Sequence, residues 1–296
     1  MGNVCAMRYA SEPDPMLRGK YSSQESDENF PVALRLLPAR IRADLHAVYA
    51  VARTIDDLGD RATGDRVAAL TDFRADLREI WRSGNPRHAV LRQLVPTVRA
   101  HAINPKPFED LIEANLLDQR VHSYATYDDL IDYCRLSADP VGRLVLAVFG
   151  VDDPAVEALS DRVCRALQLV EHWQDVGEDR AAGRIYLPQE DLARFGVVEA
   201  DLDRPATTAP LRALMRFETE RATDLMTSGA PIVGRLRGWA RVAVAGYVAG
   251  GFAAARALLR TDGDVLAQDP AVHRRDVLRE MAKLLRPRLR THGERA

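Results

Sequence analysis

The chain has little cysteine. Three of its 296 residues are cysteine (Cys5, Cys134 and Cys164), and they stand far apart in the sequence. An odd and scattered set excludes the disulfide framework that holds many small secreted domains, and it is typical of a reducing compartment. We therefore expect a cytoplasmic protein.

The chain also lacks a strong charge imbalance and a membrane-length apolar run. Its formal net charge of −2 provides no overall field to attract nucleic acid.

Residues 1–25 form a polar tail without the apolar core of a secretory signal. The most apolar stretch, residues 242–255 ("VAVAGYVAGGFAAA"), has 14 residues, fewer than the roughly 20 that span a bilayer. We expect a buried helix of small residues there and no transmembrane segment.

No segment shows the alternation of a β-strand, and no tandem repeat or flexible linker divides the chain. Apolar residues instead recur every three or four positions, which predicts helices, and the breaks between them carry Gly, Pro, Asn and Asp. The sequence therefore predicts one all-α domain over residues 26–290. Beyond a first helix that ends near residue 60, the predicted helices cover residues 66–82, 88–101, 106–120, 127–149, 154–180, 209–227, 231–259 and 270–286.

The first predicted helix ends on an unexpected cluster of acids. Its last turns, in "YAVARTIDDLGD" (49–60), carry three aspartates, although the negative end of a helix macrodipole favours cations. Gly59 and Gly64 are typical of a helix terminus. The acids therefore need an explanation other than helix stability.

A second acidic stretch, "LQLVEHWQDVGEDRAAGRIYLP" (167–188), repeats the pattern at the end of another helix. Positions at i, i+4, i+7 and i+11 lie within about 60° of one line along a helix. Asp57 lies about 80° away from the first such line. The two sets with this spacing are Tyr49, Arg53, Asp56 and Asp60, and Gln168, His172, Asp175 and Asp179.

Either acidic set alone is explained by a solvated helix face. Two matching sets, each placed against its macrodipole, favour a shared cation instead. Mg²⁺ prefers oxygen ligands, takes one or two carboxylates, and completes its coordination with water and phosphate oxygens. Two acidic faces opposite each other would hold Mg²⁺ around a diphosphate and assist its departure.

These motifs resemble those of the squalene and phytoene synthases, which have the all-α isoprenoid synthase fold. The resemblance rests on the two acidic motifs, on "RIYLP" (184–188) and on "YCRLSADPVGRLVL" (133–146), and it covers nearly the whole predicted domain. The segments "ENFPVALRLLP" (28–38) and "LVEHWQDVGEDR" (169–180) are most similar to the branch that makes hydroxysqualene in the hopanoid pathway.

The resemblance implies a helical bundle around a central cavity, with the acidic motifs on opposite walls. It implies four Mg²⁺ ligands, Asp56, Asp60, Asp175 and Asp179, and Glu171 is a further candidate ligand beside them. Many relatives have Asn in place of Glu171, so this residue is either a further ligand or a salt-bridged face residue.

Substrate contacts follow from the same resemblance. Arg53 would contact the diphosphate, with Tyr49 and Gln168 lining the same cavity, while Arg184 and Tyr186 would close over the diphosphate. Asn29 would replace a polar contact that relatives make through serine. Four aromatic residues are candidates for stabilising a carbocation, with ordinary core packing as the alternative for each: Phe30, Tyr133, Phe149 and Trp173.

His172 has two possible roles. Its unperturbed pKa near 6.5 would suit deprotonation of an attacking water. Alternatively, the imidazole is a hydrogen-bonded part of the cavity wall.

The implied reaction is the Mg²⁺-dependent conversion of presqualene diphosphate and water to hydroxysqualene and diphosphate, a carbon–oxygen lyase reaction within squalene and hopanoid biosynthesis. The first alternative is the head-to-head condensation of two farnesyl diphosphates. The second is a non-catalytic relative that binds lipid or another pathway enzyme, although such a protein would not need four aligned carboxylates. No nicotinamide-binding fingerprint is found.

The C-terminal segment is basic. Residues 270–296 hold eight Arg or Lys against three acids. This pattern predicts either a solvated helix face or peripheral contact with an anionic bilayer, such as the inner face of the cell membrane.

Overall fold

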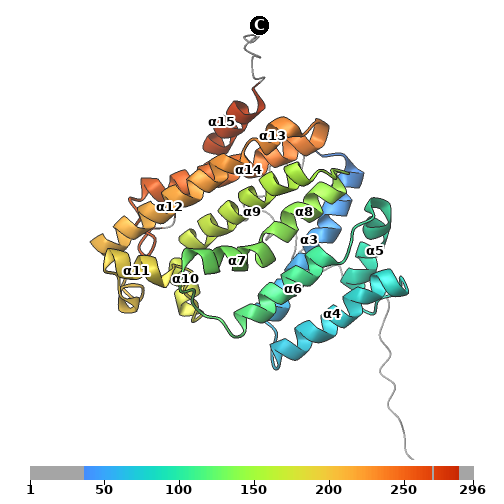
Figure 1. The fold of residues 1–296 in the computed structure, drawn as a ribbon, viewed down its shortest axis with the longest axis horizontal. Coiled ribbons are helices and arrows are strands. Elements are labelled where there is room, and N and C mark those ends of the chain that lie inside the picture. Colours follow the sequence, from blue (N-terminus) through green and yellow to red (C-terminus); the bar gives the residue numbers. More distant parts are fainter. Residues whose placement is uncertain (1–36, 269, 287–296) are drawn as a thin grey trace, which may run out of the picture.

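The structure is a computed structural model that describes residues 37–268 and 270–286 (Figure 1). The described residues form helices without a β-strand, and the one β-bridge joins Ser123 to Ile185. The predicted all-α class is therefore confirmed. The predicted tail, the domain boundaries at residues 26 and 290, and the candidates Asn29 and Phe30 lie outside the described residues.

The helices follow one another with short connections. Their bounds are α3 (Ala39–Asp60), α4 (Arg66–Arg82), α5 (Ala89–His101), α6 (Lys106–Asp118), α7 (Tyr127–Ser137), α8 (Asp139–Val148), α9 (Pro154–Gln174), α10 (Val176–Ala181), α11 (Gln189–Phe195), the 3₁₀ turn η1 (Glu199–Asp201), α12 (Ala209–Gly229), α13 (Ile232–Arg235), α14 (Gly238–Arg260) and α15 (Arg274–Leu285).

Local sequence explains where several helices begin. The side chains of Asp65, Asp153 and Thr208 accept hydrogen bonds from backbone N–H groups in the first turns of α4, α9 and α12. Thr126 and Asp129 form a reciprocal capping box at the start of α7. These caps satisfy N–H groups that the helices themselves leave without a partner.

Three predicted helices are interrupted. The predicted 127–149 helix divides into α7 and α8 at Ala138, because Pro140 lacks an N–H group and disfavours helical geometry just before it. The 154–180 helix divides into α9 and α10 at Asp175, and the 231–259 helix into α13 and α14. The first helix ends near residue 60, as predicted, since α3 ends at Asp60.

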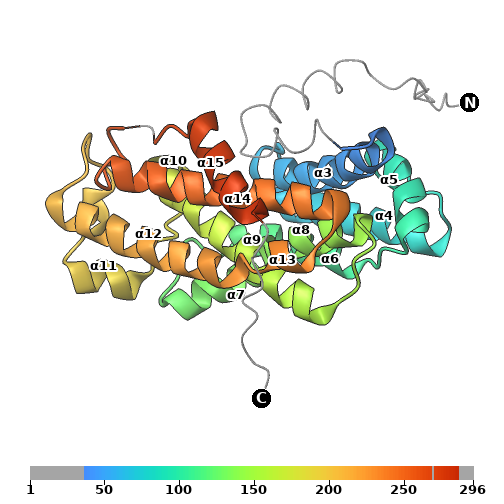
Figure 2. The same ribbon diagram turned by 90° about the horizontal axis from the view of Figure 1, so that it is seen from above.

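The helices pack around three apolar clusters. Helices α9, α12 and α14 run side by side, with α4 and α5 at one end of the molecule and α11 at the other (Figure 1). One cluster includes Phe73 and Phe108 near α3–α6, and a second surrounds Trp173. The third joins α9, α13 and α14 and includes Ile232. Helix α15 lies on the outer side of α14 (Figure 2).

Helix α14 is long and apolar enough to cross a membrane by length and composition, since its 23 residues extend beyond the predicted 14-residue run. Packing points to another role, because 72% of its most apolar window is buried inside the protein. Alanine and glycine line this helix, so neighbouring helices approach it closely.

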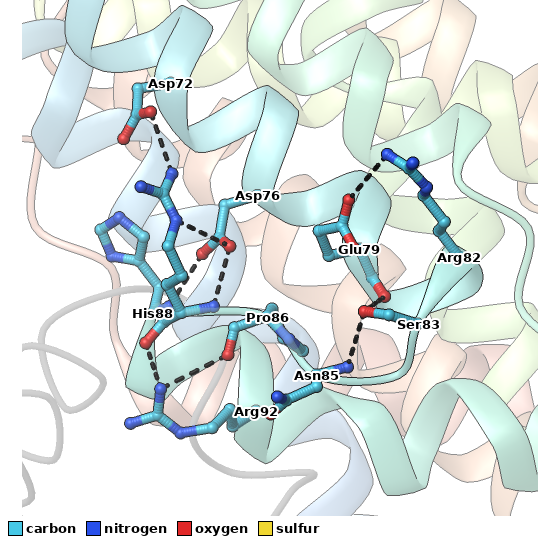
Figure 3. Close-up of polar contacts among 10 residues, drawn as sticks. Asp72, Asp76, Glu79, Arg82, Ser83, Asn85, Pro86, His88 and Arg92 are labelled. Carbon is cyan, nitrogen blue, oxygen red and sulfur yellow. Dashed lines mark hydrogen bonds and ion pairs between the residues drawn. The ribbon is translucent and has the colours of Figure 1, made fainter.

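The connection between α4 and α5 is held by a buried carboxylate (Figure 3). Asp76 accepts hydrogen bonds from the backbone N–H groups of Arg87 and His88, both at 2.8 Å. Burial alone would raise the pKa of Asp76, but these hydrogen bonds hold it below the ordinary value of 3.8. The ionised carboxylate thus serves as the anchor of this turn.

Candidate active site

A cavity of about 400 Å³ lies between α3, α6, α8, α9 and α14. Both sets of residues with matching spacing line it, so the helical-face argument identified one shared site. The residues from the two motifs that line this cavity are Tyr49, Arg53, Asp56, Asp60, Gln168, Glu171, His172, Asp175, Asp179, Arg184 and Tyr186.

The lining changes from apolar to polar along α9. Val163 and Leu167 line the cavity in the middle of the helix, followed by Gln168, Glu171 and, at its end, Asp175. The other apolar walls come from α6, α8, α13 and α14, through Leu111, Val141, Val145, Leu146, Ile232 and Val244. The cavity therefore has one charged end and one end suited to hydrocarbon.

On the first wall, Asp56 is held by α6. Asn115 donates a hydrogen bond from Nδ2 to Oδ1 of Asp56 at 3.1 Å. Burial raises the pKa of Asp56 to about 6, although the Asn115 hydrogen bond lowers it and nearby Asp60 raises it further. Gly59 permits this approach, because a Cβ atom there would lie 2.2 Å from Oδ1 of Asn115.

Asp57 lies off this wall, as the spacing predicted. It is absent from the cavity lining and forms ion pairs with Arg53 and Arg61, each at 3.4 Å. Asp57 can therefore influence the site through Arg53, from the side.

The second wall continues across the break between α9 and α10. The N–H of Asp179 donates to the carbonyl oxygen of Asp175 at 2.8 Å, which keeps the helical spacing through the interruption. Oδ2 of Asp179 is buried and accepts no hydrogen bond from the residues that the structure describes, but it lies 3.6 Å from Nδ1 of His172. This oxygen therefore faces the cavity side of His172 and can accept a further donor or a cation.

Arg184 connects the two walls. Its Nη1 donates a hydrogen bond to Oδ1 of Asp60 at 3.0 Å, although 124 residues separate the two in sequence. The Arg184 backbone N–H also donates to the carbonyl oxygen of Asp179 at 2.8 Å, after a turn at Gly183 with φ +80°. A side chain from the second motif therefore reaches the first.

His172 is buried in the cavity wall. Its ring stacks on that of Tyr186, with centroids 3.6 Å apart and planes at 15°. Nε2 of His172 lies 3.3 Å from Nε2 of Gln168. With the Gln168 amide in this orientation, its NH₂ group donates a hydrogen bond to Nε2 of the imidazole. The imidazole then carries its proton on Nδ1, which faces Asp179. Burial lowers the pKa of His172, although Asp179 opposes this shift, and the ring is neutral at pH 7.

Sequence reasoning missed two cavity residues on α6, Asn115 and Asp118. Asp118 accepts hydrogen bonds from the hydroxyl groups of Tyr133 (2.9 Å) and Tyr186 (3.4 Å). Burial raises the pKa of Asp118 to about 7, against the lowering effects of the Tyr133 hydrogen bond and of Arg184. The available signal was weak: two polar residues three positions apart in "ANLLDQ" (114–119).

The aromatic candidates have different outcomes. Tyr133 lines the cavity, as predicted, and Tyr247 of α14 also lines it. Trp173 is wrong as a wall residue, because it is fully buried in the core and absent from the lining. Phe149 likewise packs against the core rather than lining the cavity.

The donor set at the charged end consists of carboxylate oxygens from two helical segments. Within residues 37–268 and 270–286, no three side chains of His, Cys, Asp or Glu converge closely enough to hold a metal ion by themselves. Any cation here would therefore share ligands with water or with an anionic substrate, which is the usual situation for Mg²⁺.

Comparisons with known proteins agree on the family. The squalene/phytoene synthase family matches residues 23–278. The hydroxysqualene synthase of Zymomonas mobilis is 39% identical over 206 residues, covering 68% of each chain. The presqualene diphosphate synthase of Rhodopseudomonas palustris is 34% identical over 201 residues, covering 64% of this chain and 71% of its own.

Solved structures agree with the observed fold. The crystal structure of the squalene synthase HpnC from Alicyclobacillus acidocaldarius has a TM-score of 0.74 and 39% sequence identity, and the match covers 84% of this chain and 97% of that one. The fold, the shared cavity and the family match lead to one conclusion: the chain belongs to the squalene/phytoene synthase family.

Proposed function

We propose that the protein converts presqualene diphosphate and water to hydroxysqualene and diphosphate. The observation that carries this proposal is the hydrogen-bonded pair of Gln168 and His172 beside the charged end of the cavity. These residues place a neutral imidazole and an amide where a water molecule could be held next to a substrate cation. The similarity to the Zymomonas mobilis hydroxysqualene synthase supports the same reaction.

The carboxylates of both walls fit Mg²⁺, and we assign them to its binding. All are oxygen donors, Asp179 has a buried oxygen without a hydrogen bond from the described residues, and burial raises the pKa of Asp56 to about 6, which a bound cation would oppose. The proposed ligands are Asp56, Asp60, Glu171, Asp175 and Asp179. When bound, Mg²⁺ would supply Lewis-acid stabilisation of the departing diphosphate.

The arginines would bind the diphosphate. Arg53 lies in the cavity lining beside Asp56, and Arg184 also lines the cavity, where it contacts Asp60. Bidentate guanidinium groups suit phosphate oxygens. Tyr49 lines the same end, and Tyr186 supports the His172 ring by stacking.

Loss of diphosphate leaves a substrate cation, which rearranges against the apolar walls. The oxygen of one water then forms the new C–O bond, and a water proton passes to Nε2 of His172 as the contact with Gln168 gives way. Exclusion of other water by the apolar residues of α8, α13 and α14 protects the cation until then.

We further propose a cytoplasmic location, consistent with the two described cysteines, which are free thiols.

The test is a comparison of substrates with the purified full chain and Mg²⁺, without a nicotinamide cofactor. We expect presqualene diphosphate to yield hydroxysqualene, and farnesyl diphosphate alone to yield little product. A ready conversion of farnesyl diphosphate into presqualene diphosphate would contradict the proposal.

The second candidate is the condensation of two farnesyl diphosphates. The 34% identity to the Rhodopseudomonas palustris presqualene diphosphate synthase favours it. It requires space for two diphosphates at once, so it predicts that two molecules of a non-reactive farnesyl diphosphate analogue bind per chain. One bound molecule in a calorimetric titration would favour the hydroxysqualene reaction.

A further inference from the structure

We propose that one face of the protein binds the surface of an anionic lipid bilayer. This face, here called the basic face, consists of the α13–α14 corner and the outer side of α15. Its exposed residues are Arg235, Arg237, Trp239, Arg274, Arg275, Leu278, Arg279, Lys283 and Arg286.

The orientation of α15 separates its charges. Its two acids point inward, where Asp276 pairs with Arg260 at 3.0 Å and Glu280 with Arg256 at 2.6 Å, both on α14. Each of these acids is only 7% exposed. The outer side of the helix therefore carries basic residues without an exposed acid among residues 274–286.

The α13–α14 corner extends this surface. Residues 230–241 contain no acid, and the corner lies next to the end of α15, because Arg241 donates a hydrogen bond to the carbonyl oxygen of Leu285. Figures 1 and 2 show α13, α14 and α15 as neighbours. Most arginines elsewhere are ion-paired, but five on the basic face have no ion pair with any acid that the structure describes: Arg235, Arg237, Arg274, Arg275 and Arg279.

Apolar side chains favour a bilayer over a nucleic acid or an acidic protein. Trp239 is 44% exposed and Leu278 is 56% exposed, and both stand among the arginines. Tryptophan and arginine together are typical of the interface between water and lipid. An anionic surface attracts such basic residues within a short distance.

The position of the basic face relative to the cavity supports the same occupant. Ile232 lines the apolar end of the cavity, and Arg235, three residues later in α13, is exposed on the basic face. Helix α13 thus extends from the hydrocarbon-lined end of the cavity to this surface. Docking there would place a lipid phase next to the part of the cavity that suits an apolar molecule.

The test is flotation of the full chain with lipid vesicles. We expect binding to vesicles of equal parts phosphatidylcholine and phosphatidylglycerol, little binding to phosphatidylcholine alone, and release at high salt. The double variant Arg235→Glu/Arg237→Glu should weaken binding at least about tenfold. A matched control, Arg66→Glu/Arg82→Glu, makes the same charge change on α4 and should bind as the unmodified chain does.

Equal loss in the control variant, equal binding to both vesicle types, or a preference for duplex DNA over vesicles would overturn the proposal. Point variants are preferred to deletion of α15, because deletion would uncover α14. A second measurement uses the unmodified chain: brominated lipid should quench tryptophan fluorescence, and Trp239→Phe should abolish the quenching. The other two tryptophans are Trp173, which is fully buried, and Trp81, which is partly buried on α4 and outside the basic face, so quenching that persists in Trp239→Phe would also contradict the assignment.

Discussion

Arg184 and Asp60 form a hydrogen bond at 3.0 Å that links the second acidic motif to the first. Asp60 lines the cavity with 45% of its side chain exposed, whereas Arg184 is mostly covered. Arg184 also lies close enough to Asp118 to lower the pKa of that carboxyl. The guanidinium therefore lies near Asp60 and Asp118, where it can compensate their charge or transfer to an anionic substrate.

Replacement of Arg184 should weaken catalysis without unfolding the protein. We expect Arg184→Gln to lower kcat/KM by about ten- to a hundredfold, because a charged hydrogen bond contributes about 1.5–3 kcal/mol. Arg180→Gln is the matched control, since Arg180 pairs with Glu199 and Asp203 and does not line the cavity. Equal losses in steady-state kinetics of the two variants would contradict a role at the diphosphate.

Asp56 and Asp57 of the first motif should respond differently to loss of charge. Asp56→Asn removes a proposed Mg²⁺ ligand, so we expect activity to fall by at least about a hundredfold, and likewise for Asp175→Asn on the opposite wall. Asp57→Asn should cost less, because Asp57 contacts Arg53 and Arg61 instead of the cavity. Mg²⁺ titrations of activity and circular dichroism would check these results. Similar losses at Asp56 and Asp57 would be inconsistent with the geometry.

His172→Phe should change the product more than the rate of ionisation. Phenylalanine can keep the stacking on Tyr186 but cannot hold or deprotonate a water. We expect the yield of the alcohol relative to other products to fall by about tenfold or more, because a general base speeds proton transfer from the attacking water by about a hundredfold or more. Diphosphate release should fall less. An unchanged alcohol fraction would show that His172 is only part of the wall.

Asp118 should make the metal-free protein less stable as the pH rises. Its pKa is about 7 in the folded chain against 3.8 ordinarily, so the folded state binds more protons between these values. Its contribution to the free energy of unfolding is therefore full below about pH 4 and is lost as the pH rises through about 7.

Denaturant unfolding at several pH values would measure this effect. Asp118→Asn should gain free energy of unfolding relative to the unmodified chain as the pH rises, by roughly 2–4 kcal/mol over the range. Asp128→Asn, at an exposed position on α7, is the control. A pH-independent difference for Asp118→Asn would argue against a buried, protonated carboxyl.

Much of this architecture could be predicted from the sequence, because the relevant signals are local. The apolar spacing matched α4 residue for residue, and the i, i+4, i+7, i+11 spacing brought eight residues to one cavity. Pro140 was a visible signal for the break between α7 and α8 that the periodicity concealed.

The contributions of α6 could not be predicted in this way. Asn115 meets Asp56 across 59 residues of sequence, and Asp118 meets Tyr186 across 68. Such contacts depend on how helices pack, which a helix's own periodicity does not specify. Trp173, by contrast, could have been placed from the periodicity of α9. It follows His172 by one position, about 100° round the helix, and its ring lies in the core.

The most direct test of the proposed reaction is the fate of water oxygen. The purified chain would be given presqualene diphosphate and Mg²⁺ in water enriched in heavy oxygen, and the products examined by mass spectrometry. The account predicts hydroxysqualene that carries one heavy oxygen atom. A product without solvent oxygen, whether a hydrocarbon or an alcohol whose oxygen comes from the diphosphate, would contradict it.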